Sequence, residues 1–255
     1  MRFSVLGSGS RGNAVYVESN GSAALIDAGF SGKELQKRMQ SIDRDLSDVK
    51  ALCITHEHND HICGAGIISR RFEIPVIING ATLEAASGKI GKLYDTTLFS
   101  AGDVIEVGDL TIRSFRISHD TADPVGFVIS DGNKRLGYLT DTGKVSHLMA
   151  QRLISCHGVI LEFNHDLEML KYGPYPLPLQ QRVRSSRGHL SNDDAANFLI
   201  ELMGGEVQEV VLAHLSEKNN TVDLARDAAI KSIMQWPTVN LHIAKQDTAM
   251  PLLQL

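Results

Sequence analysis

Short apolar runs recur along the whole chain, and each is bounded by glycine, proline, asparagine or aspartate. Many of these runs alternate with polar residues or are rich in β-branched residues, a pattern typical of β-strands. The predicted strands cover residues 3–6, 14–18, 23–26, 51–54, 75–78, 104–107, 110–113, 115–117, 125–129, 136–139, 159–161, 207–212 and 241–244.

Apolar positions at helical spacing follow several of the predicted strands. They predict helices that begin after Ser31, Gly64 and Ser191, and a further helix over residues 223–236. Prolines at three positions predict an extended loop over residues 173–178. Both halves of the chain contain strands followed by helices, which predicts an α/β fold of two β-sheets packed face to face with helices outside.

A glycine-rich segment follows the first predicted strand. Gly7, Gly9 and Gly12 spell G-x-G-x-x-G, the dinucleotide-binding fingerprint, and Asp27 lies downstream where a ribose-binding acid is expected. That fingerprint requires a helix after the third glycine. The residues that follow are instead alternating and β-branched, and they end in an Asn-Gly turn. The pattern therefore favours a glycine-rich turn between two strands.

Composition sets broad limits on fold and function. The 255 residues are 43% hydrophobic and 22% charged, which is typical of a globular protein with a sizeable core, and we expect one large domain. The formal net charge of -5 argues against a protein that coats nucleic acid by bulk positive charge. A local basic patch is still compatible with this balance.

The cysteines and the apolar segments predict where the protein works. Cys53, Cys63 and Cys156 form no C-x-x-C pair and no even framework, so reduced thiols in a reducing compartment are expected. The first residues lack the long apolar region of a signal peptide, and no stretch approaches the ~20 apolar residues of a membrane span. A cytoplasmic protein without membrane contact is predicted.

One segment carries most of the chemistry. His56, His58, Asp60 and His61 form H-x-H-x-D-H directly after the predicted strand 51–54. Neutral imidazole and carboxylate groups are ligands that suit Zn²⁺, Mn²⁺ or Fe. We therefore predict a metal site, in which the first two histidines bind one ion and the aspartate and third histidine bind another. A histidine-rich surface loop is the alternative.

Other metal-type side chains also follow predicted strands. His119, Asp141 and His214 each stand at the end of a strand, far from the histidine motif in sequence. Asp27 stands at a strand end as well, where it would support the site by hydrogen bonding to a ligand. Together with the histidine motif, His119, Asp141 and His214 make four separated strand ends that offer metal-type ligands.

This series of strand ends resembles the metallo-β-lactamase superfamily, whose members share a four-layer αββα sandwich and a two-metal site. Further segments resemble the YycJ/WalJ branch of metal-dependent hydrolases, which is related to tRNA 3′-processing endonucleases and cyclic-phosphate phosphodiesterases. The matching segments are L-G-S-G-S at 6–10, L-I-D-A-G at 25–29, E-F-N-H-D at 162–166, G-H-L-S-N at 188–192 and A-H-L-S at 213–216. The resemblance implies a single hydrolase domain over residues 1–255.

The resemblance also implies the ligand set. One metal would be bound by His56, His58 and His119, the other by Asp60, His61 and His214, with Asp141 bridging both. Exported β-lactamases have cysteine or histidine at the bridging position, so antibiotic hydrolysis is not expected. The chain also lacks the long inserted arm of tRNA-processing relatives, which argues against a dedicated tRNA endonuclease.

Two divalent cations about 3.5 to 4 Å apart lower the pKa of a shared water and clamp a phosphoryl group during in-line attack. Zn²⁺ or Mn²⁺ is expected, and Fe also suits the ligands. Asp60 is placed to orient the attacking oxygen. His189 matches a histidine that lies near the scissile phosphate in related phosphodiesterases, where it would protonate the leaving oxygen.

Residues beside these motifs are candidates for substrate binding. Arg182 and Arg184 precede His189, and guanidinium groups suit phosphates. A solvated charged surface is the alternative interpretation of this stretch. Asn164 and His165 follow a strand and are predicted either to contact substrate or to support the metal ligands.

The sequence therefore predicts a dinuclear metal-dependent hydrolase, a phosphodiesterase or nuclease of the DNA exonuclease kind, with nucleic acid or a small phosphodiester as its partner. A small-molecule hydrolase of cyclic phosphodiesters or, in the manner of glyoxalase II, of thioesters is the alternative enzyme. A nucleotide- or metal-binding regulatory module is the alternative outside enzymes.

Overall fold

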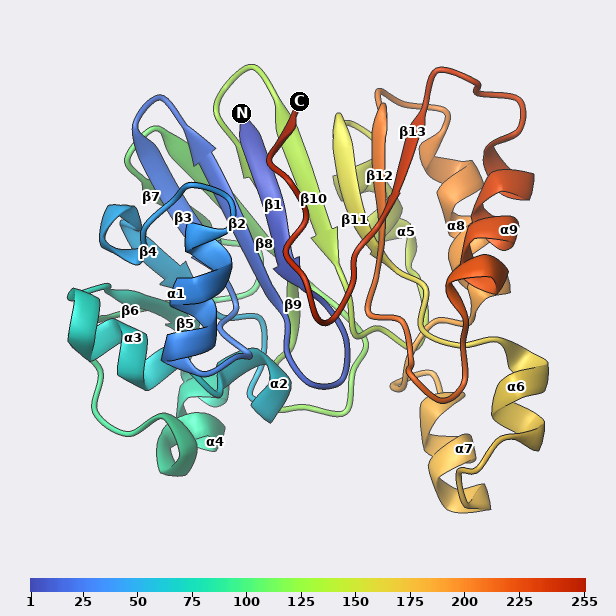
Figure 1. The fold of residues 1–255 in the computed structure, drawn as a ribbon, viewed down its shortest axis with the longest axis horizontal. Coiled ribbons are helices and arrows are strands. Elements are labelled where there is room, and N and C mark those ends of the chain that lie inside the picture. Colours follow the sequence, from blue (N-terminus) through green and yellow to red (C-terminus); the bar gives the residue numbers. More distant parts are fainter. The chain divides into compact units, whose positions relative to one another are not determined.

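The computed structural model describes all 255 residues (Figure 1). It contains fourteen strands, nine α-helices and one 3₁₀ helix, and the strands form two mixed sheets of seven. The predicted α/β fold with two mixed sheets is confirmed.

The chain divides into two compact units. The first contains residues 1–116, 121–134 and 245–254, and the second contains residues 117–120, 135–244 and 255. The prediction of a single domain stays a prediction.

One seven-stranded sheet lies wholly in the first unit, in the order β14-β1-β2-β3-β4-β5-β6. Its strands are β1 (Arg2–Gly7), β2 (Ala14–Ser19), β3 (Ser22–Ile26), β4 (Ala51–Cys53), β5 (Val76–Asn79), β6 (Thr96–Phe99) and β14 (Leu253–Gln254). Neighbours from β14 to β3 pair antiparallel, and neighbours from β3 to β6 pair parallel. Parallel neighbours need crossover connections, which helices supply here.

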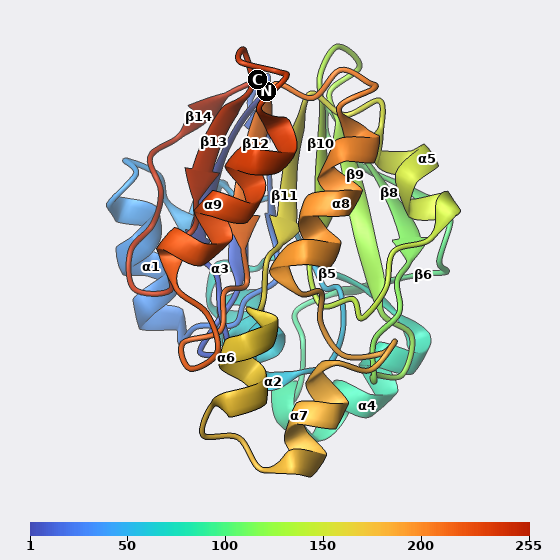
Figure 2. The same cartoon turned by 90° about the vertical axis from the view of Figure 1, so that its right-hand side faces the viewer.

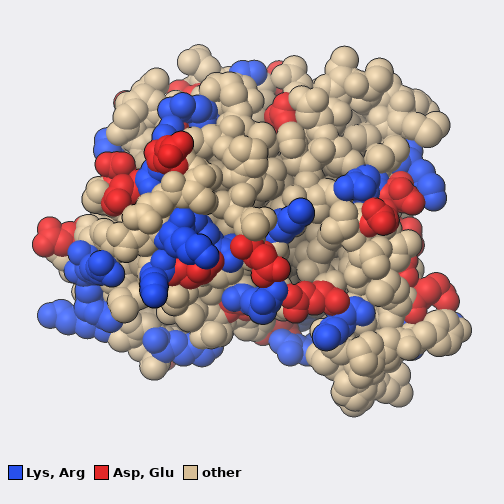
Figure 3. Space-filling view, viewed as in Figure 1, with Lys and Arg blue, Asp and Glu red and all other residues tan.

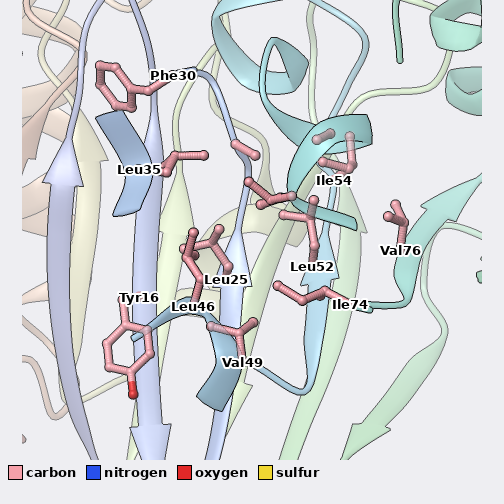
Figure 4. Close-up of a cluster of buried hydrophobic side chains, with 14 of the residues drawn as sticks. Tyr16, Leu25, Phe30, Leu35, Leu46, Val49, Leu52, Ile54, Ile74 and Val76 are labelled. Atoms are coloured by element: carbon pink, nitrogen blue, oxygen red, sulfur yellow. The ribbon is translucent and has the colours of Figure 1, made fainter. Parts of the chain in front are cut away.

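The crossover helices cover the sheet of the first unit with apolar side chains. These elements are α1 (Gly32–Gln40), the 3₁₀ helix η1 (Leu46–Asp48), α2 (Asn59–Ile62), α3 (Ala65–Phe72) and α4 (Gly80–Ile90). The Ser31 side chain accepts a hydrogen bond from the Glu34 backbone N–H, so the predicted start of α1 is confirmed. Leu25, Leu35 and Leu52 are fully buried in the core of this unit (Figure 4), and each contributes about 1.5–3 kcal/mol to folding.

Three further strands of the first unit pair antiparallel. They are β7 (Val104–Val107), β8 (Leu110–Arg116) and β9 (Val125–Ser130). Leu110 and Ile112 are buried in β8 while the residues that follow them are exposed, which is the period of two that a half-buried strand requires. The ring centroid of Phe127 in β9 lies 6.0 Å from that of Phe99 in β6. Strand β9 therefore packs against the sheet that contains β6.

The second unit contains four parallel strands and five helices. They are β10 (Arg135–Leu139), α5 (His147–Leu153), β11 (Gly158–Glu162), α6 (Leu167–Tyr172), α7 (Leu177–Val183), α8 (Asn192–Leu202), β12 (Glu209–Ala213), α9 (Val222–Ile233) and β13 (Asn240–Ile243). In register, Leu139 pairs with Leu161 and Leu161 with Leu212. The carboxyl ends of β10, β11 and β12 therefore meet at one edge. Helices α8 and α9 run side by side (Figure 2).

Two sequence interpretations are decided by these elements. The dinucleotide alternative is wrong, because the glycine-rich segment joins β1 to the antiparallel strand β2 rather than to a helix. The extended loop is shorter than predicted, because α7 begins at Leu177 and contains Pro178. A proline is tolerated there, since the first turn of a helix needs no amide donor.

None of the nine helices combines the length and the apolar composition that crossing a membrane requires. On the face viewed in Figure 3, basic and acidic side chains are interspersed rather than separated into large areas of one sign.

Candidate metal centre

The histidine motif of the first unit leaves the end of β4 and enters α2. His56 and His61 are fully buried. The ring centroid of His56 lies 4.9 Å from that of His58 and 4.0 Å from that of His61. Asp60 Oδ2 lies 3.6 Å from His61 Nε2. The first unit thus gathers all four predicted ligands of the motif.

Asp27, directly after β3, holds this motif in position. Its buried carboxylate accepts hydrogen bonds from the Thr55 backbone N–H on Oδ1 and from the Thr55 hydroxyl on Oδ2, each at 2.8 Å. His61 Nδ1 lies 2.8 Å from the same Oδ2, and the Thr55 hydroxyl lies 3.0 Å from His56 Nδ1. One aspartate therefore orients two predicted ligands, which is the geometry that its predicted supporting role requires.

Asn13, on the glycine-rich segment, is a residue that the sequence pattern did not single out. Its backbone N–H donates to the Asp60 carbonyl oxygen at 2.7 Å. Its side-chain Nδ2 lies 3.2 Å from Asp60 Oδ2 and 3.0 Å from His61 Nε2. Close approach of the chain here requires Gly29, because a Cβ at that position would lie 1.7 Å from the Asp60 carbonyl oxygen. The glycine-rich segment thus contacts the histidine motif.

A second polar cluster lies at the carboxyl edge of the parallel strands in the second unit. Asp141, Glu162 and His214 stand at the ends of β10, β11 and β12, and His189 lies between α7 and α8. One ligand atom from each of these four residues lies within 4.8 Å of the others. His119 Nε2 lies 3.9 Å from Asp141 Oδ1. The second unit therefore brings together its three predicted ligands and His189.

Glu162 is the centre of this cluster, although the sequence analysis assigned it no role. Its Oε1 lies 2.9 Å from His189 Nδ1 and 2.8 Å from His214 Nδ1. Its Oε2 accepts hydrogen bonds from the backbone N–H groups of Leu190 and Thr142 at 3.0 and 3.2 Å. Burial raises the pKa of Glu162, but the two histidines outweigh that effect and lower the pKa to about 2. Glu162 is therefore a buried carboxylate at neutral pH.

Four of the predicted histidine ligands share one arrangement, in which Nδ1 faces an oxygen of the same unit. The Nδ1–oxygen pairs are His56 with Thr55 Oγ1 at 3.0 Å, His61 with Asp27 Oδ2 at 2.8 Å, His119 with the Gly188 carbonyl at 3.1 Å and His214 with Glu162 Oε1 at 2.8 Å. These oxygens assign the proton to Nδ1. The lone pair is then on Nε2, as in metal-binding histidines whose other nitrogen is held by a carboxylate or carbonyl. The donor set fits divalent metal ions.

Three of the six non-glycine residues with positive φ belong to the predicted site. Asp27, Asp141 and His214 have φ values of 60°, 59° and 55°. Residues other than glycine adopt this left-handed conformation at a cost of about 1–3 kcal/mol each, and it is common at functional sites. Asp27 and His214 directly follow β3 and β12, and Asp141 stands two residues after β10.

The candidate substrate residues differ in exposure. Arg182 and Arg184 are exposed, and Arg182 Nε lies 2.5 Å from Asp120 Oδ2. Asn164 is buried, and its Nδ2 donates to the His214 carbonyl oxygen at 2.9 Å. His165 is fully buried, and burial lowers its pKa to about 4, so its ring offers no positive charge at neutral pH. The buried positions of Asn164 and His165 suit a role in supporting the site. Substrate contact stays a prediction for these two residues and for both arginines.

The fold and the donor set are those of a metal-dependent hydrolase, and comparison with known proteins gives its class. Residues 7–148 match the model of the metallo-beta-lactamase superfamily. The chain belongs to this superfamily, and the predicted family and hydrolase class are confirmed. The fold is similar to that of the crystal structure of YhfI from Bacillus subtilis, a metallo-beta-lactamase fold protein, which aligns over 98% of both chains with a TM-score of 0.75 and 18% identity.

Two curated relatives are much more similar in sequence. Exodeoxyribonuclease YycJ of Bacillus anthracis is 39% identical over 228 residues, which cover 89% of this chain and 86% of the relative. Exodeoxyribonuclease WalJ of Streptococcus pneumoniae serotype 2 is 35% identical over an alignment that covers 100% of this chain and 98% of the relative.

Proposed function

We propose that the chain is a two-metal phosphodiesterase that degrades DNA from its ends. The observation that carries the proposal is the shared arrangement of His56, His61, His119 and His214, in which an oxygen of the same unit holds each Nδ1, as in metal-binding histidines. The names of the two similar relatives support DNA as the substrate. The alignment with them covers most or all of the chain, so the proposal concerns the whole protein.

The ligands proposed for the two cations are the seven residues predicted from the sequence, namely His56, His58, Asp60, His61, His119, Asp141 and His214. Zn²⁺ and Mn²⁺ are the cations we propose, since imidazole and carboxylate ligands suit both. When bound, they supply Lewis-acid chemistry, which makes water a nucleophile at neutral pH and neutralises phosphoryl charge.

The remaining chemistry falls to side chains of the second unit. His189 is partly exposed and its Nδ1 is held at 2.9 Å by the carboxylate of Glu162. This contact fixes the ring and leaves Nε2 to donate a proton to the leaving oxygen. Asp60 is proposed to orient the attacking water, and Arg182 and Arg184 to bind phosphates that lead into the site.

The experiment compares end-labelled DNA and bis(4-nitrophenyl) phosphate as substrates of the metal-stripped protein after reloading with Mn²⁺ or Zn²⁺. We expect metal-dependent release of mononucleotides. His189→Ala should lower kcat by ~10²-fold or more while metal content is unchanged, because only the proton donor is lost. His147→Ala, at an exposed position of α5, is the matched control.

Each failure has a distinct meaning. Hydrolysis of the small ester without any attack on DNA would move the substrate to small phosphodiesters. Failure to hydrolyse either substrate with either metal would overturn the phosphodiesterase proposal. Normal turnover by His189→Ala would remove that residue from the mechanism.

A further inference from the structure

A helical hairpin projects from the carboxyl edge of the second unit, between the two residues that organise its polar cluster. We call residues 166–187 the α6–α7 arm. It starts four residues after Glu162, and it ends two residues before His189. Figures 1 and 2 show α6 and α7 lying beyond the strand ends of this unit.

The arm has a composition unlike that of the rest of the chain. The arm begins with two acidic residues, Asp166 and Glu168, and its remaining part, residues 169–187, contains four basic residues and no acidic residue, although the whole chain has a net charge of -5. Two large side chains near its tip are exposed to solvent, Tyr172 at 74% and Leu177 at 64%. A hairpin that served only to connect two strands would not need exposed aromatic and aliphatic groups in an acid-free segment.

The exposure of Tyr172 follows from how α6 is anchored. Leu170 is fully buried, and residues two apart on a helix point to different sides, so Tyr172 faces outward. Asp166 caps the helix by accepting the Met169 backbone N–H at 2.8 Å. At Gly173, an added Cβ would lie 2.4 Å from the Met169 carbonyl oxygen, so the chain turns tightly after Tyr172. The ring is therefore presented by a short helix that Leu170 anchors and Asp166 caps.

The base of the arm is bonded to the segment that carries a predicted metal ligand. Arg187 Nε donates to the His119 carbonyl oxygen at 3.2 Å, and the Ser118 hydroxyl donates to the Ser186 carbonyl oxygen at 2.7 Å. Arg182 pairs with Asp120 at 2.5 Å. A molecule bound on the arm would thus be held beside His119 and His189 of the same unit.

We propose that the α6–α7 arm binds single-stranded DNA, with a base stacked on Tyr172 and the phosphates following the arginines toward His189. The inference rests on the proposed function and names the form of its substrate. Aromatic faces bind unpaired bases of any sequence, and basic groups beside them follow the backbone. Lys171 Nζ lies 4.7 Å from the centroid of the Tyr172 ring, which places a positive charge at the stacking surface. Paired bases hide their faces, so duplex ends must fray before they bind.

The test measures binding of a fluorescein-labelled oligothymidine to the full-length protein in chelator, by fluorescence anisotropy. Tyr172→Ala should raise Kd for the single strand on the order of 5- to 100-fold, the loss expected for one stacked base. Tyr172→Phe keeps the ring and should bind within about twofold of the wild type. Tyr94→Ala removes another exposed tyrosine, which is 55% exposed in the first unit, and is the matched control.

Hydrolysis of bis(4-nitrophenyl) phosphate by each metal-loaded variant separates binding from catalysis. The rate should be the same for wild type and Tyr172→Ala, which also shows that the variant is folded. Unchanged binding of the single strand by Tyr172→Ala would overturn the inference. So would a wild-type dimer, measured by sedimentation, that Tyr172→Ala converts to monomer without a change in Kd, because a second copy would then occupy the arm.

The inference and the proposed function fail in different ways. A wild-type protein that neither binds nor cleaves DNA would refute both. A wild type that cleaves DNA and a Tyr172→Ala variant that cleaves it with the same KM would refute the arm alone.

Discussion

Replacing Glu162 by glutamine should weaken both the fold and the metal centre. The wild-type carboxylate accepts hydrogen bonds from the Leu190 and Thr142 backbone and contacts Nδ1 of His189 and His214. An amide has a single acceptor oxygen, and its NH₂ group would face groups that are themselves donors. Because the pKa of Glu162 is lowered to about 2, the substitution also removes a negative charge at neutral pH.

The size of the effect follows from the number of hydrogen bonds lost. Hydrogen bonds to a charged group contribute about 1.5–3 kcal/mol each. Losing two of the four contacts of the Glu162 carboxylate should therefore lower the free energy of unfolding by about 3–6 kcal/mol. Misplacing a histidine ligand through its supporting partner typically weakens metal binding ~10–100-fold. A domain with ~5–15 kcal/mol of stability still has room to fold after a loss near the lower figure.

The assay therefore measures two quantities. Urea unfolding of the metal-free protein gives the free energy of unfolding, and competition with a chromogenic chelator gives the metal affinity. Glu201→Gln, at an exposed position of α8, is the matched control and should change neither. A Glu162→Gln protein with wild-type stability and wild-type metal affinity would refute the role of this carboxylate.

Three further predictions concern other parts of the molecule. Asp27→Asn should lower metal affinity ~10–100-fold, because His61 Nδ1 loses its carboxylate; chelator competition measures this, and unchanged affinity would contradict it. For Asp131, hydrogen bonds from two backbone amides and a serine hydroxyl outweigh burial and hold the carboxyl pKa below its usual range. The stability it contributes is present above its unfolded pKa and is lost as pH falls, so the deficit of Asp131→Asn in urea unfolding should shrink from about pH 7 to about pH 3; a deficit independent of pH would argue otherwise. Arg182→Ala combined with Arg184→Ala should weaken DNA binding and flatten its salt dependence, and an unchanged salt slope would place the phosphate path elsewhere.

The ligands predicted from sequence leave a local signal, and the structure brings those of each unit together. His56, His58, Asp60 and His61 are crowded into six residues, and His119, Asp141 and His214 each follow an apolar run that ends abruptly. The parallel register of β10, β11 and β12 brings the carboxyl ends of these three strands to one edge of the sheet. Residue type and spacing therefore indicate which side chains gather in each unit, whereas their role as metal ligands is implied by the family resemblance and stays a prediction.

The supporting residues left no comparable signal. Glu162 ends an apolar strand like many surface glutamates, and only its burial and its two histidine contacts reveal its role. Asn13 lies 48 residues from the histidine that it contacts, on a segment whose glycines suggested a different ligand. The left-handed backbone of Asp141 and His214 also has no sequence signature, because it is imposed by tertiary packing.

The short helices were missed for a related reason. Helix α6 has six residues and α7 has seven, too few for a helical period to stand out from the prolines around them. Their stability comes from caps and from buried anchors such as Leu170, which depend on tertiary contacts. The exposed face of the arm therefore became visible only in the folded chain.

The most direct test of a two-metal DNA-degrading enzyme is a titration of the metal-stripped protein with Mn²⁺ while mononucleotide release from end-labelled DNA is followed. Activity should rise with added metal and level off at two equivalents per chain. A plateau at one equivalent would contradict the dinuclear site, and the absence of mononucleotide release at any metal concentration, with Zn²⁺ as well, would contradict the nuclease.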